Sequence, residues 1–176
     1  MHQPEPAMQV GYVVADLDAS IRYWLQHTGI GPWTVFRGVE LDGRYQGQQV
    51  TVTMDVAMGY SGELQIELMQ ITSSTPSPYA HESGAPKLGP HHLAWITDDL
   101  DASVAQARER GLEVLFAAEG SGTRIAYLES PEQPGVVFEH IQGEGLREMV
   151  AHGIEQARTW DGTDPVRPVV PEPPNR

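Results

Sequence analysis

The sequence contains no cysteine. This absence excludes disulfide scaffolds, thiolate zinc sites, iron–sulfur clusters and cysteine nucleophiles together. Basic residues are scarce as well: 11 Lys and Arg, with Lys87 the single lysine, stand against 24 Asp and Glu, and the formal net charge is -13. A field of that sign repels nucleic acids and anionic membranes, so we expect neither as a partner.

Long apolar runs are also missing. No stretch of the sequence approaches the ~20 residues that a membrane-spanning helix needs. The N-terminus has no basic segment followed by an apolar core, as a secretory signal would. We therefore expect a cytoplasmic protein. A chain of 176 residues can bury a sizeable core, and its length favours a single domain over residues 1–176.

Two short motifs occur twice each and divide the chain into similar halves. The sequence Asp-Leu-Asp-Ala-Ser at 16–20 recurs unchanged at 99–103, an offset of 83 residues, between a strand-like stretch and a helical one. Taken alone, this repeat could reflect helix N-capping used twice. A second pair, Ile-Glu-Leu-Met-Gln at 66–70 and Phe-Glu-His-Ile-Gln at 138–142, lies 72 residues apart. The two pairs together favour a repeated structural unit.

The repeat predicts an α+β fold with two tandem βαβββ modules. The first module spans 8–72 and the second spans 91–142, and a linker rich in Pro, Ser and Gly at 73–90 joins them. We expect the strands to form a curved mixed sheet around a central cleft.

The last part of the chain departs from the repeat. Apolar residues at helical spacing predict an amphipathic helix over 144–160 that packs through Leu146, Met149 and Ile154. Five prolines follow within 161–176, which predicts an extended or disordered tail.

Strand alternation places four polar side chains on the faces that point away from the helices, because residues two apart share a face. These residues occupy equivalent positions in the two modules: Gln9, Glu67, His92 and Glu139. A twofold relation between the modules would bring the four side chains to one place. The small residues Gly11 and Ala94, each two positions after one of them, would leave room there for a bound species.

At these residues the chain resembles the vicinal-oxygen-chelate superfamily, which includes glyoxalase I, methylmalonyl-CoA epimerase, extradiol dioxygenases and bleomycin-resistance proteins. The resemblance covers about residues 8–142. It rests on the tandem strand–helix pattern, on Pro-His-His-Leu-Ala-Trp at 90–95 and on Gly-Val-Val-Phe-Glu at 135–139. The doubled His, the following Trp and the Gly-x-x-x-Glu ending are most similar to the methylmalonyl-CoA epimerase and glyoxalase-like branch.

The resemblance implies a divalent metal held by the first and last strand of each module, here by Gln9, Glu67, His92 and Glu139. The sequence departs from the family's commonest pattern at Gln9, where a His is usual. One imidazole, two carboxylates and an amide oxygen suit Mg, Mn, Co or Ni as well as Zn. We favour metal ligation by His92 and Glu139 and leave the role of Gln9 open.

Such a site would support proton transfer next to a carbonyl, because a cation stabilises the charge that develops on the carbonyl oxygen. Glu139 and Glu67 are the candidate catalytic bases. We expect an isomerase, epimerase or lyase of the glyoxalase type that acts on a small molecule or an acyl thioester. The epimerase branch takes its second acid from the third strand of the first module, where only Asp55 is present. This difference weakens the case for methylmalonyl-CoA epimerisation.

The alternative is a binding protein without turnover, of the bleomycin-resistance type, which would hold a drug or another hydrophobe. Two glutamates facing an apolar cleft without a cation would be costly, so we prefer the enzyme. Trp33 and Arg124 are candidate substrate-binding residues, the first as an aromatic wall and the second for a carboxylate or phosphate. A core tryptophan and an exposed turn arginine are the competing interpretations. The resemblance also implies a homodimer.

Overall fold

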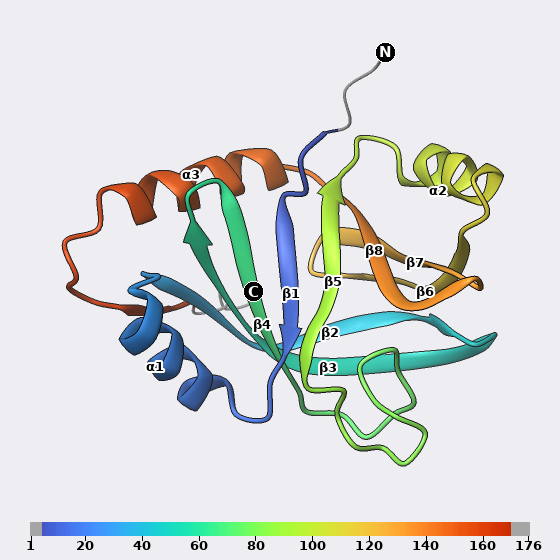
Figure 1. The fold of residues 1–176 in the computed structure, drawn as a ribbon, viewed down its shortest axis with the longest axis horizontal. Coiled ribbons are helices and arrows are strands. Elements are labelled where there is room, and N and C mark those ends of the chain that lie inside the picture. The colour runs from blue at the N-terminus through green and yellow to red at the C-terminus, as the bar shows by residue number, and fades with distance from the viewer. Residues whose placement is uncertain (1–4, 170–176) are drawn as a thin grey trace, which may run out of the picture.

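The computed structural model describes residues 5–169 and has a mixed α+β architecture in which helices flank a strongly curved sheet (Figure 1). The elements follow one another as β1 (Gln9–Val13), α1 (Leu17–Thr28), β2 (Trp33–Tyr45), β3 (Gln48–Ser61), β4 (Leu64–Ile71), β5 (Gly89–Ile96), α2 (Leu100–Glu109), β6 (Glu113–Gly120), β7 (Thr123–Ser130), β8 (Gln133–Gly143), α3 (Leu146–Arg158) and β9 (Val166–Pro168).

Within residues 5–169 the strands form one sheet in the order β3-β4-β1-β5-β8-β7-β6-β2-β9. An additional antiparallel pairing joins β3, the first strand of this order, to β2, the last but one, so the sheet closes into a barrel. Strand β1 is parallel to β4, and β5 is parallel to β8. Between these pairs, β1 and β5 run antiparallel side by side in the centre of Figure 1. The strands that carry the four polar residues are therefore neighbours in the sheet.

The repeated Asp-Leu-Asp-Ala-Ser motif begins α1 and α2. The carboxylate of Asp16 accepts a hydrogen bond from the backbone N–H of Ala19 at 2.8 Å. In the second copy, Asp99 accepts from the N–H of Ala102 at 2.9 Å. Each Asp thus satisfies one of the free N–H groups of the first helical turn, a contact that stabilises a helix by roughly 1 kcal/mol.

The glutamine that ends each copy of the second motif contacts the same two helix starts. Gln70 Oε1 accepts a hydrogen bond from the backbone N–H of Leu17 at 2.7 Å. Gln142 Oε1 accepts from the N–H of Leu100 at 3.2 Å. These contacts fix the start of α1 to β4 and the start of α2 to β8. In each case that strand pairs in parallel with the strand that precedes the helix, β1 or β5.

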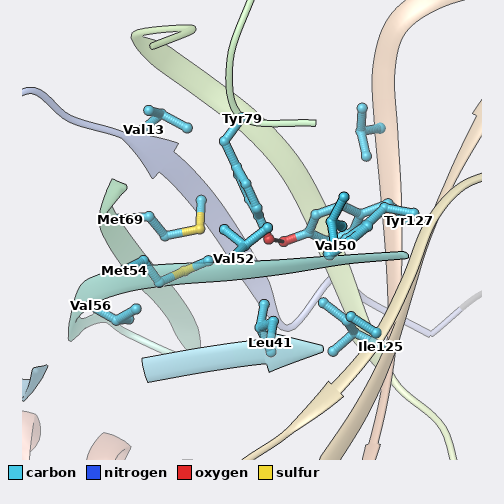
Figure 2. Close-up of a cluster of buried hydrophobic side chains, with 13 residues drawn as sticks. Val13, Leu41, Val50, Val52, Met54, Val56, Met69, Tyr79, Ile125 and Tyr127 are labelled. Atoms are coloured by element: carbon cyan, nitrogen blue, oxygen red, sulfur yellow. Dashed lines mark hydrogen bonds between the residues drawn. The ribbon is translucent and has the colours of Figure 1, made fainter. Parts of the chain in front are cut away.

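Two apolar clusters hold the fold together. One lies between α1 and the outer face of the sheet and contains Leu17, Ile21, Trp33, Val35, Ala57, Ile66 and Leu68. The other lies inside the closed sheet, where Val52, Met54 and Val56 of β3 face Met69 and the tyrosines Tyr79 and Tyr127 (Figure 2). Alternate β3 residues point inward, as the sequence pattern predicts. Each fully buried side chain of this size stabilises the fold by about 1.5–3 kcal/mol.

The helix expected over 144–160 is present as α3, Leu146–Arg158. Its packing differs from the prediction: Leu146 and Val150 are buried, whereas Met149 is 41% exposed. The helix fits against β3 at Gly153, where an added Cβ would collide with the ring of Tyr60. Among residues 5–169, no helix is both long and apolar enough to cross a membrane.

The described part of the tail is ordered by pairing with the sheet. Strand β9 runs parallel to β2, with Val166 opposite Trp33 and Pro168 opposite Val35. The sequence predicted an extended or disordered tail over 161–176; residues 166–168 are extended, but their pairing with β2 was not predicted. Residues 170–176 lie outside the described residues.

Candidate functional site

The four polar residues of the repeat meet at one point inside the closed sheet. His92 Nε2 lies 3.0 Å from Glu139 Oε2, 3.1 Å from Gln9 Oε1 and 3.4 Å from Glu67 Oε2. Gln9, His92 and Glu139 are each less than 5% exposed. Glu67 is the more accessible of the two acids, with 13% of its side chain exposed against 5% for Glu139. We call these four residues the polar cluster.

Gly11 provides the space that the His92 ring occupies. It lies opposite His92 in the antiparallel pairing of β1 with β5, and an added Cβ would overlap the imidazole ring. Tyr127 stacks on the other side of the same ring, with centroids 5.1 Å apart and an interplanar angle of 30°. The small residue expected beside the cluster therefore admits the imidazole itself.

A chain of amide and hydroxyl groups fixes the orientation of Gln9. Gln9 Nε2 donates to Gln65 Oε1 at 2.7 Å, and Gln65 Nε2 donates to the Tyr60 hydroxyl at 2.5 Å. Because the Gln9 nitrogen is used in this way, its oxygen is the atom turned toward His92. Sequence reasoning missed Gln65, although the signal was present: it lies two residues before Glu67 and so shares its face.

His91 fixes the ring orientation of His92 through the opposite nitrogen. His91 Nε2 lies 3.2 Å from the Pro78 carbonyl, which can only accept, and His91 Nδ1 lies 3.0 Å from His92 Nδ1. His91 Nε2 is therefore a donor, its Nδ1 is an acceptor, and His92 Nδ1 carries a proton. Neutral His92 would then present the Nε2 lone pair to the polar cluster, which is the arrangement that metal-binding histidines use.

The pKa values of the two histidines are shifted in opposite directions. Burial lowers the pKa of His91 to about 3, and the neighbouring His92 adds to this effect. Burial also disfavours the charged form of His92, but Glu139 and Glu67 outweigh it and raise the pKa of His92 to about 10. Burial raises the pKa of Glu139, against the opposing effect of His92. At neutral pH the polar cluster thus retains a proton that His92 Nε2 shares with Glu139.

The polar cluster lies at one end of a cavity of about 430 Å³ inside the closed sheet. Its walls are largely apolar and come from strands β1 to β8 and α3, with Phe36, Val39, Leu41, Met54, Met58 and Ile141 among them. Leu146, Met149 and Val150 of α3 line it on one side, and the turn between β6 and β7 lines it at 120–123. The expected central cleft is therefore a largely apolar chamber with three of the four cluster residues in its lining.

A tyrosine from the segment 73–90 completes the chamber. Tyr79 is fully buried, lines the cavity, and shares a hydrogen bond of 2.8 Å with the hydroxyl of Tyr127 (Figure 2). Burial raises the pKa of both phenols well above the usual value. Sequence reasoning treated 73–90 as a linker and missed this residue, because a single tyrosine among prolines and serines carries no periodic signal.

Two predicted substrate-binding residues do not reach the cavity. Trp33 is fully buried in the cluster under α1, and its indole N–H donates to the Ile30 carbonyl at 2.8 Å. Arg124 lies on the outer face of β7, where its guanidinium pairs with Asp101 at 2.9 Å. The physical reason is strand alternation, since Ile125 and Tyr127 point inward and Arg124 must point outward. Trp33 therefore lies in the core and Arg124 on the surface, as the competing interpretations describe.

The donor set of the polar cluster suits a divalent metal in chemistry, since an imidazole, two carboxylates and an amide oxygen are ligands that such ions take. Among residues 5–169, no group of three or more His, Asp or Glu side chains is arranged to hold a metal ion. His92 Nε2 instead lies at hydrogen-bond or ion-pair distance, 3.0 to 3.4 Å, from one oxygen of each of the other three residues. Metal binding there would require the shared proton to leave and these side chains to rearrange.

Comparison with known proteins places this geometry in a family. Residues 8–127 match the family model described as the Glyoxalase/Bleomycin resistance protein/Dioxygenase superfamily. A hypothetical protein from Bacillus halodurans C-125 superposes with a TM-score of 0.56 and 20% identity, over 79% of this chain and 94% of that chain. No curated protein matches the sequence significantly.

Epimerases are also among the similar structures. A methylmalonyl-CoA epimerase in complex with methylmalonyl-CoA and NH4+ gives a TM-score of 0.53 at 23% identity, over 80% of this chain and 95% of that one. The methylmalonyl-CoA epimerase from Mycobacterium tuberculosis gives 0.52 at 22% identity, over 81% and 93%. At such identities the likeness concerns the fold. The family match, which spans more than half of the sequence, shows that this chain belongs to the Glyoxalase/Bleomycin resistance protein/Dioxygenase superfamily.

Proposed function

We propose that the protein is a metal-dependent, glyoxalase-like enzyme that moves a proton next to a carbonyl group, in an isomerase, epimerase or lyase reaction. The observation that carries this proposal is the convergence of two carboxylates, an imidazole and an amide oxygen at one end of an apolar cavity. Buried carboxylates are costly unless something compensates their charge, so their retention favours a chemical role.

We propose His92, Glu139 and Glu67 as the metal ligands, with Gln9 as a weaker fourth ligand. The hydrogen bond from His92 Nδ1 to His91 orients the imidazole, and the Gln65 contact turns the Gln9 oxygen to the same side. A divalent ion such as Mg, Mn, Co, Ni or Zn, when bound there, would polarise a carbonyl oxygen.

The proposed base is one of the two glutamates. Both line the cavity, so either can reach a substrate α-carbon held there. Glu139 is the more buried, and burial raises its pKa, which strengthens it as a base. Glu67 is more accessible and lies farther from His92 Nε2, so it can rotate toward a ligand with less loss of hydrogen bonding. Both therefore remain candidate catalytic residues.

The test is deuterium exchange. The protein is purified without chelators, loaded in turn with Mn, Co and Zn, and incubated in heavy water with a panel of ketones, β-keto compounds, 2-oxo aldehyde adducts and 2-substituted acyl thioesters. Loss of α-carbon exchange in Glu139→Gln or Glu67→Gln, with metal retained, would identify the base, and the loss should be ~10²–10⁴-fold. Glu113→Gln, an exposed acid on β6, is the matched control. Exchange that persists in both variants would contradict the assignment.

The alternative is a binding protein of the bleomycin-resistance type that holds a hydrophobe without turnover. The apolar walls of the cavity favour it, since they would suit a ligand with few polar groups. Tight binding of an apolar compound to a protein that shows no exchange with any member of the panel would support this function and overturn the enzymatic one.

The organisation into two βαβββ modules is part of the same proposal. It is supported by the matching order of elements in the two halves and by the equivalent contacts of Gln70 and Gln142 with the helix starts. The homodimer, the small-molecule substrate and the cytoplasmic location stay predictions. Light scattering coupled to size-exclusion chromatography checks the first of these.

A further inference from the structure

We propose that Gln65 determines specificity by donating a hydrogen bond from its side-chain nitrogen to a second oxygen of the substrate. The substrate class is then a carbonyl compound with an apolar body and one further hydrogen-bond-accepting oxygen, such as an ether, a hydroxyl or a second carbonyl. This inference rests on the proposed function for the reaction, but it concerns which molecule the cavity accepts.

Two amide N–H groups at the cavity have no partner in the protein. A side-chain amide carries two N–H donors. Gln9 Nε2 donates to Gln65 Oε1 at 2.7 Å, and Gln65 Nε2 donates to the Tyr60 hydroxyl at 2.5 Å. Among residues 5–169, neither nitrogen has a second acceptor. One N–H of each glutamine is thus left over.

These leftover donors are enclosed by protein except at the cavity. Gln9 is 3% exposed and Gln65 is 2% exposed, and both line the cavity. A buried N–H without an acceptor costs roughly 1–3 kcal/mol. The cavity is the space from which an acceptor reaches these groups, either a water or an oxygen of the ligand. A ligand that displaces such a water without replacing its hydrogen bond loses affinity.

The strand register places the amides beside the proposed reaction centre. Gln65 on β4 lies directly opposite Gln9 on β1, and Gln9 lies opposite Ala94 on β5. Ala94 is in turn opposite Glu139 on β8, and its side chain is a single methyl group. Neighbouring strands are ~4.8 Å apart. A ligand whose carbonyl lies at the polar cluster therefore reaches the Gln65 nitrogen with an oxygen a few bonds farther along its chain.

A cation in the polar cluster does not change these donors. Metal ions bind the oxygen of an amide, and Gln9 Oε1 is the atom turned toward His92. The nitrogens of Gln9 and Gln65 keep their hydrogens whether the polar cluster holds a shared proton or a divalent ion. The hydrogen-bonding requirement on the ligand is therefore the same in the metal-free and the metal-loaded protein.

The amide pair belongs to one half of the sheet. The residue 72 positions after Gln65 is Val137 on β8, which has no donor in its side chain. A ligand with two oxygens is thus held in one orientation, with its second oxygen on the side of β1 and β4. This orientation fixes which face of the α-carbon is turned toward Glu139.

The experiment uses 2-nonanone and three ether analogues of the same length, in which oxygen replaces the methylene at chain position 4, 5 or 6. Isothermal titration calorimetry on the chelator-treated protein measures their affinities, so that chelation of a metal by the probe contributes nothing. An ether oxygen is costly to bury without a donor. We expect at least one analogue to bind as tightly as 2-nonanone or more tightly.

Gln65→Met keeps the length of the side chain and removes both N–H groups. In this variant the affinity of the best ether relative to 2-nonanone should fall about tenfold or more. The probes share their shape, so a purely structural effect would change both affinities equally.

Two control variants should keep the ether preference. Tyr60→Phe interrupts the amide chain but leaves the Gln65 nitrogen in place. Gln48→Met makes the same substitution at an exposed position of β3.

Four outcomes overturn the inference: weaker binding of all three ethers than of 2-nonanone to the wild type, an unchanged ratio in Gln65→Met, loss of the preference in either control, or no binding of any probe. Failure of the proposed function is distinguishable, because an ether preference without deuterium exchange removes only the reaction. Exchange on simple ketones without an ether preference removes only this inference.

Discussion

The two halves of the polar cluster occupy equivalent strand positions but differ in chemistry. In the half formed by β1 and β4, a chain of neutral hydrogen-bonding groups runs from Gln9 through Gln65 to the hydroxyl of Tyr60 on the adjacent β3. On β5 and β8, His92 and Glu139 form a buried charged pair. The first half contributes the neutral oxygen of Gln9 and the more accessible carboxylate, Glu67, while the second contributes the imidazole and the more buried carboxylate.

One substitution between the halves accounts for much of this difference. The position equivalent to Gln65, 72 residues later on β8, is Val137. Its apolar side chain cannot form a hydrogen bond to His92 as Gln65 does to Gln9. His92 instead uses His91, which connects it to the Pro78 carbonyl in the segment 73–90. Equivalent backbones therefore support unequal ligand strengths, and the comparison predicts which changes should matter most.

The largest effect is expected at His92. His92→Ala removes the imidazole and the central contact of the polar cluster, so metal affinity should fall by more than the ~100-fold typical of residues that only support a ligand. Competition with a chromophoric chelator measures this loss. His81→Ala, an exposed histidine outside the cluster, is the control. Equal metal content in wild type and His92→Ala protein would rule out ligation by His92.

A smaller effect separates His91 from Gln9. His91→Phe removes the acceptor for His92 Nδ1 while keeping a ring at that position, and should weaken metal binding by ~10–100-fold. Gln9→Ala removes only a neutral oxygen and should cost less than tenfold, whereas Gln9→His should tighten binding. A larger loss in Gln9→Ala than in His91→Phe would reverse the ranking of the two halves.

The pH dependence of stability tests the charged half without metal. The folded-state pKa of His92 is about 10, above its usual value of 6.5, so its stabilising contribution is complete below pH 6.5 and is lost as pH rises toward 10. Urea midpoints of the chelator-treated protein should fall over this window, and His92→Gln should flatten the profile. His91, whose pKa is about 3, acts oppositely and lowers stability as pH falls below 6.5. An identical alkaline slope in His92→Gln would contradict the assignment.

The smallest effect is expected in the amide chain. Tyr60→Phe removes the hydroxyl that accepts from Gln65 and should lower the free energy of unfolding by about 1 kcal/mol. Metal affinity should change less than in Gln9→Ala, because Gln9 keeps its contact with Gln65. Urea denaturation and the chelator assay measure the two quantities. A metal affinity that falls as far as in His91→Phe would show that the amide chain does more than orient Gln9.

Local patterns predicted what depends on local physics. The motif at 16–20 and 99–103 predicted both helix starts, and period-two alternation predicted the inward faces that carry the polar cluster. The same alternation, applied to β7, would have excluded Arg124 from the cavity. Each of these features is decided within one element.

Features that depend on contacts between distant segments could not be predicted. The pairing of β2 with β6 joins residues about 75 positions apart, and nothing in the sequence of either strand indicates its partner. Tyr79 is buried inside the closed sheet although it belongs to the segment 73–90 between the two halves. Strand β9 forms through its pairing with β2, which lies more than 120 residues earlier in the sequence. The order of the side chains around His92 likewise follows from strand register rather than from sequence spacing.

Strand β9 has a consequence for how α3 is held beside the cavity. Helix α3 follows β8 directly at one end, and at the other its chain returns through Trp160, which lies against Gly31, to the edge of β2. The helix is thus anchored at both ends, and its residues Leu146, Met149 and Val150 line the cavity. Because a segment tethered at both ends has a high effective concentration near its seat, the pairing of β9 with β2 favours the packed position of α3 in addition to the helix's own contacts.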